Sequence, residues 1–180
     1  KYTLISVGSR GDMEPFLAIG VIVKENGHNV HCVMPEQFRV LTEESGLVFH
    51  SLGSEFIDML HSDAGKKAMG GGGNGFQKIW AYAKLAKQSL SIQRLLVERQ
   101  KKAVDEIQPD KIIYHTKAMY PVYWEAHHPG KTILLSPVPY LHYTEGHSHI
   151  AFGRDLGSFL NKLSYKVADW GLLKTLNSSK

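Results

Sequence analysis

A stretch of five residues near the start of the chain combines groups that are suited to chemistry. Gly8-Ser9-Arg10-Gly11-Asp12 supplies a hydroxyl, a guanidinium, a carboxylate and two glycines, between an apolar run and a helical pattern. Three interpretations compete for this loop. It is an Arg-Gly-Asp adhesion tripeptide, a loop whose amides bind phosphate, or the mouth of an active site with Asp12 as its reactive group.

Spacing and context reduce these alternatives. Gly8-x-x-Gly11, followed by Glu14, matches neither the dinucleotide-binding nor the P-loop pattern. An adhesion site needs a protruding extracellular loop, whereas this one is a tight turn between a core strand and a core helix. Cys32 is the single cysteine, which excludes an internal disulfide and fits a reducing compartment. For Asp12 two interpretations stay open: a cap for the helix that follows, and a reactive carboxylate.

The elements that would position this loop alternate along the chain. Short runs rich in β-branched and aromatic residues predict strands, and apolar residues at helical spacing predict helices. The strands are expected at 2–7, 28–35, 47–53, 111–115 and 131–136, and the helices at 13–24, 36–46, 54–62, 76–107, 118–128 and 156–176. This alternation predicts an α/β fold, a Rossmann-like doubly wound parallel sheet with helices on both faces and a strand order that reverses beside the first strand. Ligands of such sheets bind outside the carboxyl ends of the strands, where residues 9–12 would lie.

Composition excludes several classes of protein. The 180 residues are 43% hydrophobic and 21% charged, as in a soluble globular domain, and no apolar run approaches the ~20 residues that span a bilayer. The formal charge of +4 comes from scattered basic residues, which argues against a nucleic-acid surface. Weak contact with an anionic membrane surface stays open. The expected location is the cytoplasm, with a peripheral membrane contact as the alternative.

A longer stretch carries a family resemblance. "GSRGDMEPFLAIGVIVKENGHNVHCVMPEQFRVLTEESGLVFHSLG" resembles the opening of GT-B nucleotide-sugar glycosyltransferases, in the branch of sterol and other lipid glucosyltransferases and antibiotic glycosyltransferases. "IIYHTKAMYPVYWEA", "LLSPVPY" and "LNKLSYKVADWGLL" resemble later landmarks of the same amino-terminal domain, so the resemblance covers almost the whole chain. The positions that match the opening motif are Gly8, Ser9, Arg10, Gly11, Asp12, Pro15, Ala18, Gly20, Gly27 and His28.

The resemblance implies a specific function. Residues 1–180 would form the amino-terminal, acceptor-binding domain of an inverting glycosyltransferase that moves a hexose from a nucleotide sugar, most simply a UDP-sugar, to a hydroxyl of an apolar lipid, sterol or polyketide-like acceptor. Asp12 would be the general base, and no metal or other cofactor is implied. The partners would be the nucleotide sugar, the acceptor and a carboxyl-terminal donor-binding domain, so the chain alone is expected to be inactive. The rival is a stand-alone α/β domain that binds a nucleotide or a small apolar ligand without catalysis.

Further residues are candidates for binding. Ser9, Arg10 and Gly11 would face the diphosphate of the donor, although Arg10 is equally well read as a solvated side chain. For the acceptor the candidates are His115, Phe76, Trp80, Pro139 and Tyr140.

The acceptor candidates also have structural interpretations, or lie next to segments that bear on their role. His115 ends a strand and is either an acceptor contact or a packed histidine. Phe76 and Trp80 follow the glycine-rich segment 65–75, which is expected to form a flap, and would otherwise belong to the core. Pro139 and Tyr140 begin an aromatic loop in which His142, Glu145, His147 and His149 match no zinc pattern, so no metal site is expected.

Overall fold

The structure is a computed structural model that describes residues 1–63, 75–138, 143–149 and 155–178, with the backbone alone for 75–89, 175 and 178. It divides into two compact units, Lys1–Leu135 and Ser136–Lys180. The two units are described separately below.

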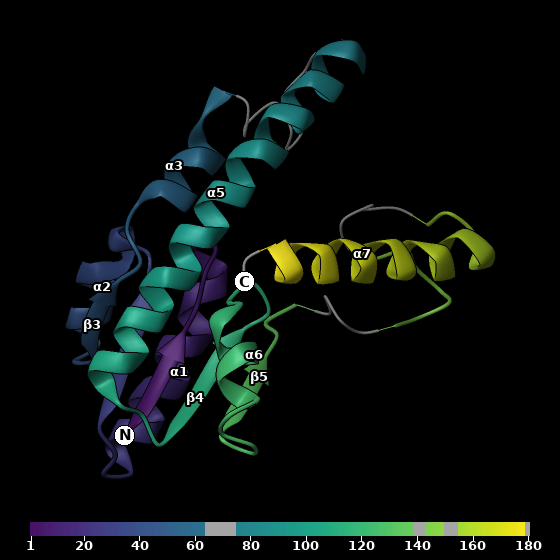
Figure 1. The fold of residues 1–180 in the computed structure, drawn as a ribbon. Coiled ribbons are helices and arrows are strands. Elements are labelled where there is room, and N and C mark those ends of the chain that lie inside the picture. Colours follow the sequence, from purple (N-terminus) through teal and green to yellow (C-terminus); the bar gives the residue numbers. More distant parts are fainter. Residues whose placement is uncertain (64–74, 139–142, 150–154, 179–180) are drawn as a thin grey trace. The chain divides into compact units, whose positions relative to one another are not determined.

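The first unit is built on a five-stranded parallel sheet (Figure 1). Its strand order is β3-β2-β1-β4-β5, so the order reverses at β1, as the sequence predicts. Each of the five expected strands is confirmed; β4 has the expected bounds and the other four are slightly shorter. They are β1 Tyr2–Ile5, β2 Val30–Met34, β3 Val48–Ser51, β4 Lys111–His115 and β5 Thr132–Leu135.

The helices also follow the expected order, with differences at their ends. The first helix begins at Arg10 instead of 13, because Ser9 is its extended N-cap residue, and Asp12 therefore lies in the first turn. The expected helix over 36–46 is a 3-10 turn followed by a short α-helix. The bounds are α1 Arg10–Glu25, η1 Glu36–Phe38, α2 Arg39–Glu44, α3 Glu55–His61, α5 Gly75–Ile107, α6 Tyr120–Glu125 and, in the second unit, α7 Ser158–Ser178.

Alternate side chains of the strands supply two separate cores. Successive residues of a strand point to opposite faces of the sheet, so each face is covered by its own helices. One core combines Ile5, Val33 and Ile112 with Leu96, Val104 and Ile107 of α5. The other combines Leu4, Cys32 and Ile113 with Met13, Phe16 and Leu17 of α1. Helices on both faces of the sheet are thereby confirmed.

In the second unit, the loop that precedes α7 packs against one face of this helix. Asn161 is buried and donates from Nδ2 to the carbonyl oxygen of Glu145 at 3.0 Å and to Oδ1 of Asp155 at 2.8 Å. Ser164 Oγ accepts the backbone N–H of His149 at 2.8 Å. These bonds tie the preceding loop to the helix through polar groups. Among the described residues, no helix is both long and apolar enough to span a membrane.

Candidate functional site

The turn between β1 and α1 folds the carboxylate of Asp12 back onto its own loop. The backbone N–H of Ser9 donates to Asp12 Oδ2 at 2.7 Å, and Ser9 Oγ donates to the same oxygen at 3.0 Å. Gly8 has φ +150°, and a Cβ atom there would lie 2.2 Å from Asp12 Oδ2. Only glycine fits beside this carboxylate, because a side chain would meet both a strained backbone and a steric clash. Asp12 is the N3 residue of a capping box whose N-cap is Ser9, which supports the capping interpretation.

A second set of groups reaches Asp12 from the end of β4. Because β1 and β4 are parallel neighbours, with Ile5 opposite Tyr114, their carboxyl ends meet at one edge of the sheet. His115 Nε2 lies 3.3 Å from Asp12 Oδ1, and Lys117 Nζ lies 3.4 Å from Asp12 Oδ2. The site thus joins residues more than a hundred positions apart in the chain.

Hydrogen bonding indicates which nitrogen of His115 carries the proton. The backbone N–H of Lys117 donates to His115 Nδ1 at 3.3 Å, so Nδ1 is the acceptor. In a neutral ring the proton then sits on Nε2, which faces Asp12. Only 1% of His115 is exposed, and its ring meets the edge of Phe16 at a centroid distance of 6.1 Å.

The electrostatic environment keeps the carboxylate charged and the imidazole neutral. Burial raises the pKa of Asp12, but the Ser9 hydrogen bonds, the Lys117 ammonium and His115 together outweigh burial and bring this pKa below its ordinary value. Burial and Lys117 lower the pKa of His115 to about 4, against the opposing effect of Asp12. At neutral pH the site is a carboxylate between a neutral imidazole and an ammonium. The carboxylate can accept a proton from a hydroxyl.

The other candidates in the first loop take different positions. Arg10 is largely exposed and pairs with Glu14, with Nε 2.7 Å from Oε1. Ser9 directs its hydroxyl and its N–H at Asp12, and Gly11 is exposed in the first turn of α1. The role of Ser9, Arg10 and Gly11 in donor binding stays a prediction.

The acceptor candidates are only partly described. The structure places His115 behind Asp12 with almost no exposed surface, which agrees with the packed alternative. Pro139, Tyr140 and most of the 65–75 segment lie outside the described residues, as do the side chains of Phe76 and Trp80 on α5. His142 is also outside, and no group of three His, Cys, Asp or Glu residues in the described part could hold a metal ion.

Lys117 is the functional residue that the sequence interpretation missed. It lies in a turn two residues after β4, inside the stretch "IIYHTKAMYPVYWEA", which carried the family resemblance but gave Lys117 no role. A signal was nevertheless present, because a strand order that reverses beside β1 places the end of another strand next to the Asp12 loop. A cation just after that strand was a candidate partner for the carboxylate.

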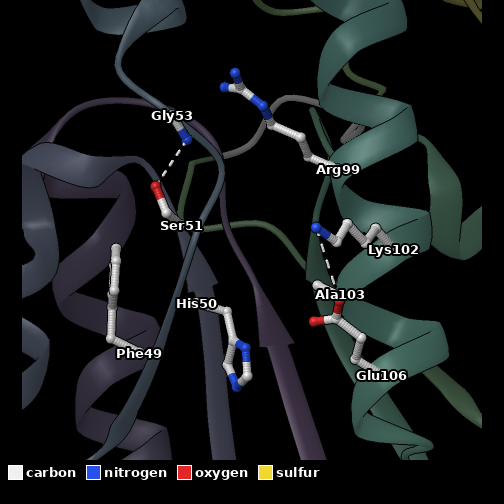
Figure 2. A pocket seen from close by; sticks show the side chains of 8 residues that line it. All are labelled: Phe49, His50, Ser51, Gly53, Arg99, Lys102, Ala103 and Glu106. Carbon is white, nitrogen blue, oxygen red and sulfur yellow. Dashed lines mark hydrogen bonds and ion pairs between the residues drawn. The ribbon is translucent and has the colours of Figure 1, made fainter.

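A cavity of about 520 Å³ also lies in the first unit, between β3 and α5 (Figure 2). Its charged groups are already paired: Arg99 with Glu55 at 2.6 Å, and Lys102 with Glu106 at 3.8 Å. The cavity is lined by Phe49, His50, Ser51, Gly53, Arg99, Lys102, Ala103 and Glu106. It includes none of the groups that contact Asp12.

Comparison with known proteins decides the family. The model of the glycosyltransferase family 28 N-terminal domain matches residues 2–108, which is more than half of the chain. The chain belongs to glycosyltransferase family 28. The resemblance to sterol and antibiotic glycosyltransferases is confirmed.

Curated relatives of this family 28 chain align with about a third of it. The UDP-sugar-dependent glycosyltransferase 52 of Dictyostelium discoideum is 39% identical over 56 residues, 31% of this chain and 3% of that protein. The sterol 3-beta-glucosyltransferase of Saccharomyces cerevisiae is 30% identical over 60 residues, 33% of this chain and 5% of that protein. The O-mycaminosyltylonolide 6-deoxyallosyltransferase of Streptomyces fradiae is 39% identical over 51 residues, 28% of this chain and 12% of that protein.

Solved structures share the fold of the family 28 chain at low identity. CalG4, the calicheamicin glycosyltransferase, matches with a TM-score of 0.59 and 13% identity, over 99% of this chain and 42% of its own. SsfS6 of Streptomyces sp. SF2575, complexed with thymidine diphosphate, matches with a TM-score of 0.51 and 16% identity, over 97% of this chain and 44% of its own. The family 28 chain therefore spans less than half the length of these glycosyltransferases.

Proposed function

We propose that this chain is the acceptor-binding half of an inverting glycosyltransferase that moves a hexose from a nucleotide sugar to a hydroxyl of an apolar acceptor. Family 28 membership supports glycosyl transfer. The names of the relatives support a UDP-sugar donor and a sterol or other lipid acceptor, and a polyketide-like acceptor fits the antibiotic enzymes. A neighbour in complex with thymidine diphosphate supports binding of a nucleoside diphosphate by the complete protein.

The observation that carries the proposal is the carboxylate of Asp12. It lies at the carboxyl ends of β1 and β4, where open parallel sheets bind ligands, and the groups around it keep it charged. Asp12 takes the proton of the acceptor hydroxyl while the hydroxyl oxygen bonds to the anomeric carbon. The bond from that carbon to the diphosphate breaks, and the diphosphate leaves with the electron pair. Because the pKa of Asp12 is below its ordinary value, the proton moves late, once the attacking hydroxyl has become acidic.

The remaining roles in the proposal follow from position. Arg10 exchanges Glu14 for the donor diphosphate, and the amide of Gly11 lies beside it. Ser9, whose N–H and hydroxyl bind Asp12, borders the diphosphate without donating to it. Phe76, Trp80, Pro139 and Tyr140 border the apolar acceptor. A donor-binding domain outside these residues completes the cleft, so the chain by itself transfers no sugar.

The test is Asp12→Asn in the protein that carries this chain. The amide keeps the size of the side chain and an acceptor for the Ser9 N–H, so the fold and donor binding should be retained. Turnover should fall by roughly 10²–10⁴, the usual contribution of a positioned base. Glu25→Gln is the matched control, because it neutralises an exposed carboxylate at the far end of the same helix, and its turnover should stay within about twofold. A loss below about tenfold for Asp12→Asn would leave Asp12 as a helix cap alone.

A further inference from the structure

The two oxygens of the Asp12 carboxylate have different surroundings. Oδ2 accepts the N–H of Ser9 at 2.7 Å and its hydroxyl at 3.0 Å, and the ammonium of Lys117 lies 3.4 Å away. Oδ1 lies 3.3 Å from His115 Nε2, which is its neighbour among the described residues. A carboxylate oxygen has two lone-pair sites, so Oδ2 is saturated whereas Oδ1 keeps one site for a further donor.

The ring of His115 has almost no freedom to choose another partner. Its Nδ1 accepts the Lys117 N–H, its face is fixed by Phe16, and 1% of the residue is exposed. Nε2 is buried and makes no well-aligned hydrogen bond within the described residues, although Asp12 Oδ1 lies within reach. A buried N–H that lacks a partner is unfavourable, so it draws the carboxylate oxygen toward it.

We propose that His115 is a positioning residue, which uses its Nε2–H to orient Asp12 so that Oδ1 takes the proton of the acceptor hydroxyl. This inference rests on the proposed function of Asp12 as the base. Lys117 contributes in two ways: its ammonium occupies Oδ2, and its backbone N–H holds the imidazole in the Nε2–H form. One short segment after β4 thereby sets both the charge and the direction of the base.

The positioning role requires a neutral imidazole. The charged and titratable groups that face Asp12 are His115 from β4 and Lys117 from the turn that follows, while Arg10 of its own helix pairs with Glu14. A second proton on His115 would convert Nδ1 from acceptor to donor and oppose the Lys117 N–H. Burial and Lys117 hold the pKa of His115 at about 4, so the neutral form persists over the physiological range.

The experiment compares two substitutions of His115 in the protein that carries this chain. His115→Phe keeps the ring volume and removes the donor, whereas His115→Gln places an amide N–H near the position of Nε2. We expect His115→Phe to lower kcat by roughly 10–100-fold with KM values changed by less than about threefold, because misplacement of the base affects the chemical step. His115→Gln should recover at least about half of that loss on a logarithmic scale. His31→Gln is the control, since it alters a partly buried histidine of β2 that does not contact Asp12.

A spectroscopic measurement tests the same inference without turnover. Long-range ¹H–¹⁵N spectra of the 180-residue chain should show His115 as the neutral Nε2–H tautomer from pH 5 to pH 8, consistent with its pKa of about 4. The ¹³C shift of the Asp12 carboxyl group should titrate at a higher pH in His115→Phe than in the parent chain, because the carboxylate loses a donor. If His115→Phe fails to fold, the tautomer in the parent chain and kcat of His115→Gln decide the question.

The possible outcomes separate the two proposals. Normal kcat in His115→Phe, together with a large loss in Asp12→Asn, would leave Asp12 as the base and overturn the role of His115. An Nδ1–H tautomer would also overturn it, as would equal losses in the Phe and Gln variants with an unchanged Asp12 titration. Normal kcat in both Asp12→Asn and His115→Phe would overturn the proposed function itself.

Discussion

The position of the Asp12 carboxylate depends on a neighbour that has no side chain. Gly8 adopts φ +150°, and the space that its Cβ would fill is taken by Asp12 Oδ2. The same carboxylate then accepts two hydrogen bonds from Ser9. The same contacts among Gly8, Ser9 and Asp12 therefore hold both the candidate base and the turn, so a change in one disturbs the other.

A methyl group at Gly8 should disturb both. We predict that Gly8→Ala pushes Asp12 away from Ser9, lowers turnover by roughly 10–100-fold and reduces the free energy of unfolding by about 1–3 kcal/mol. Gly27→Ala is the matched control, because Gly27 has φ +84° but nothing within 4 Å of the added atom. That control should lose about 1 kcal/mol of stability and keep its turnover. Equal turnover in the two variants would show that the close approach at Gly8 has no role in the site.

At the residue scale, the sequence predicts the position of a single residue better than it predicts the contacts between two residues. Asp12 is placed correctly because a residue that follows the first strand of a doubly wound sheet must lie at its ligand edge. Its contacts with His115 and Lys117 depend on the register between β1 and β4, which local spacing does not carry. The ion pair of Arg10 with Glu14 was likewise not predicted, although the two residues lie four apart on a helix.

One side chain of α5 ties three neighbouring segments of the first unit. Arg99 Nη1 donates to the carbonyl oxygen of Leu52 at 2.6 Å, and Nη1 and Nη2 bind the two carboxylate oxygens of Glu55 at 2.6 and 2.7 Å. Gly53 makes this approach possible, since a Cβ there would lie 1.6 Å from Nη1. Arg99 thus joins the end of β3 and the start of α3 to the long helix, beside the cavity in Figure 2.

Loss of this guanidinium should weaken the packing of α3 against α5. We predict that Arg99→Met lowers the free energy of unfolding by about 1 kcal/mol, because a two-point pair is lost from a partly exposed site. Lys101→Met is the control, because Lys101 is exposed and pairs with Asp105 one turn further along the same helix. The control should change stability by less than about 0.5 kcal/mol in urea unfolding. Equal losses would assign the effect of Arg99 to general surface charge.

Elements are predicted well in their order and less well at their ends. All five strands follow from β-branched and aromatic runs. The central strands β1, β2 and β4 are mostly buried and leave a continuous apolar signal. The edge strands β3 and β5 are partly exposed but carry the β-branched and aromatic residues that favour strands. The early start of α1 depends on hydrogen bonds around Ser9, and the split of 36–46 into η1 and α2 depends on the turn after Pro35. Apolar periodicity does not report such local hydrogen bonding, so the ends of these helices were missed.

For the whole molecule, stability depends on pH through three histidines: His115, which is buried, and His31 and His50, which are partly buried. Burial lowers the pKa of His31, with further lowering by His50, and burial lowers the pKa of His50. His31 Nδ1 and His50 Nε2 lie 3.0 Å apart on neighbouring strands, and His115 has a pKa of about 4. These rings are neutral when folded but take up protons near pH 6.5 when unfolded, so the unfolded state gains protons first as the pH falls.

The free energy of unfolding should therefore decrease as the pH falls from 7 to 5. His115 alone should contribute a decrease of about 2 kcal/mol over this range, and the His31–His50 pair should add to it. Urea unfolding at pH 7, 6 and 5 measures the slope, and His115→Gln should flatten it. A stability that stays level between pH 7 and pH 5 would contradict the neutral burial of these rings.

The buried cysteine gives the chain a built-in probe of its own opening. Cys32 lies in the middle of β2, has no exposed surface, and burial raises the pKa of its thiol to about 12. Thiol reagents attack the thiolate, so the folded chain should react with Ellman's reagent far more slowly than the chain in urea. Because Cys32 is the sole thiol, the rate of colour formation should report how often the sheet opens around β2. A new cysteine on the surface could then carry a fluorescent label with almost no background.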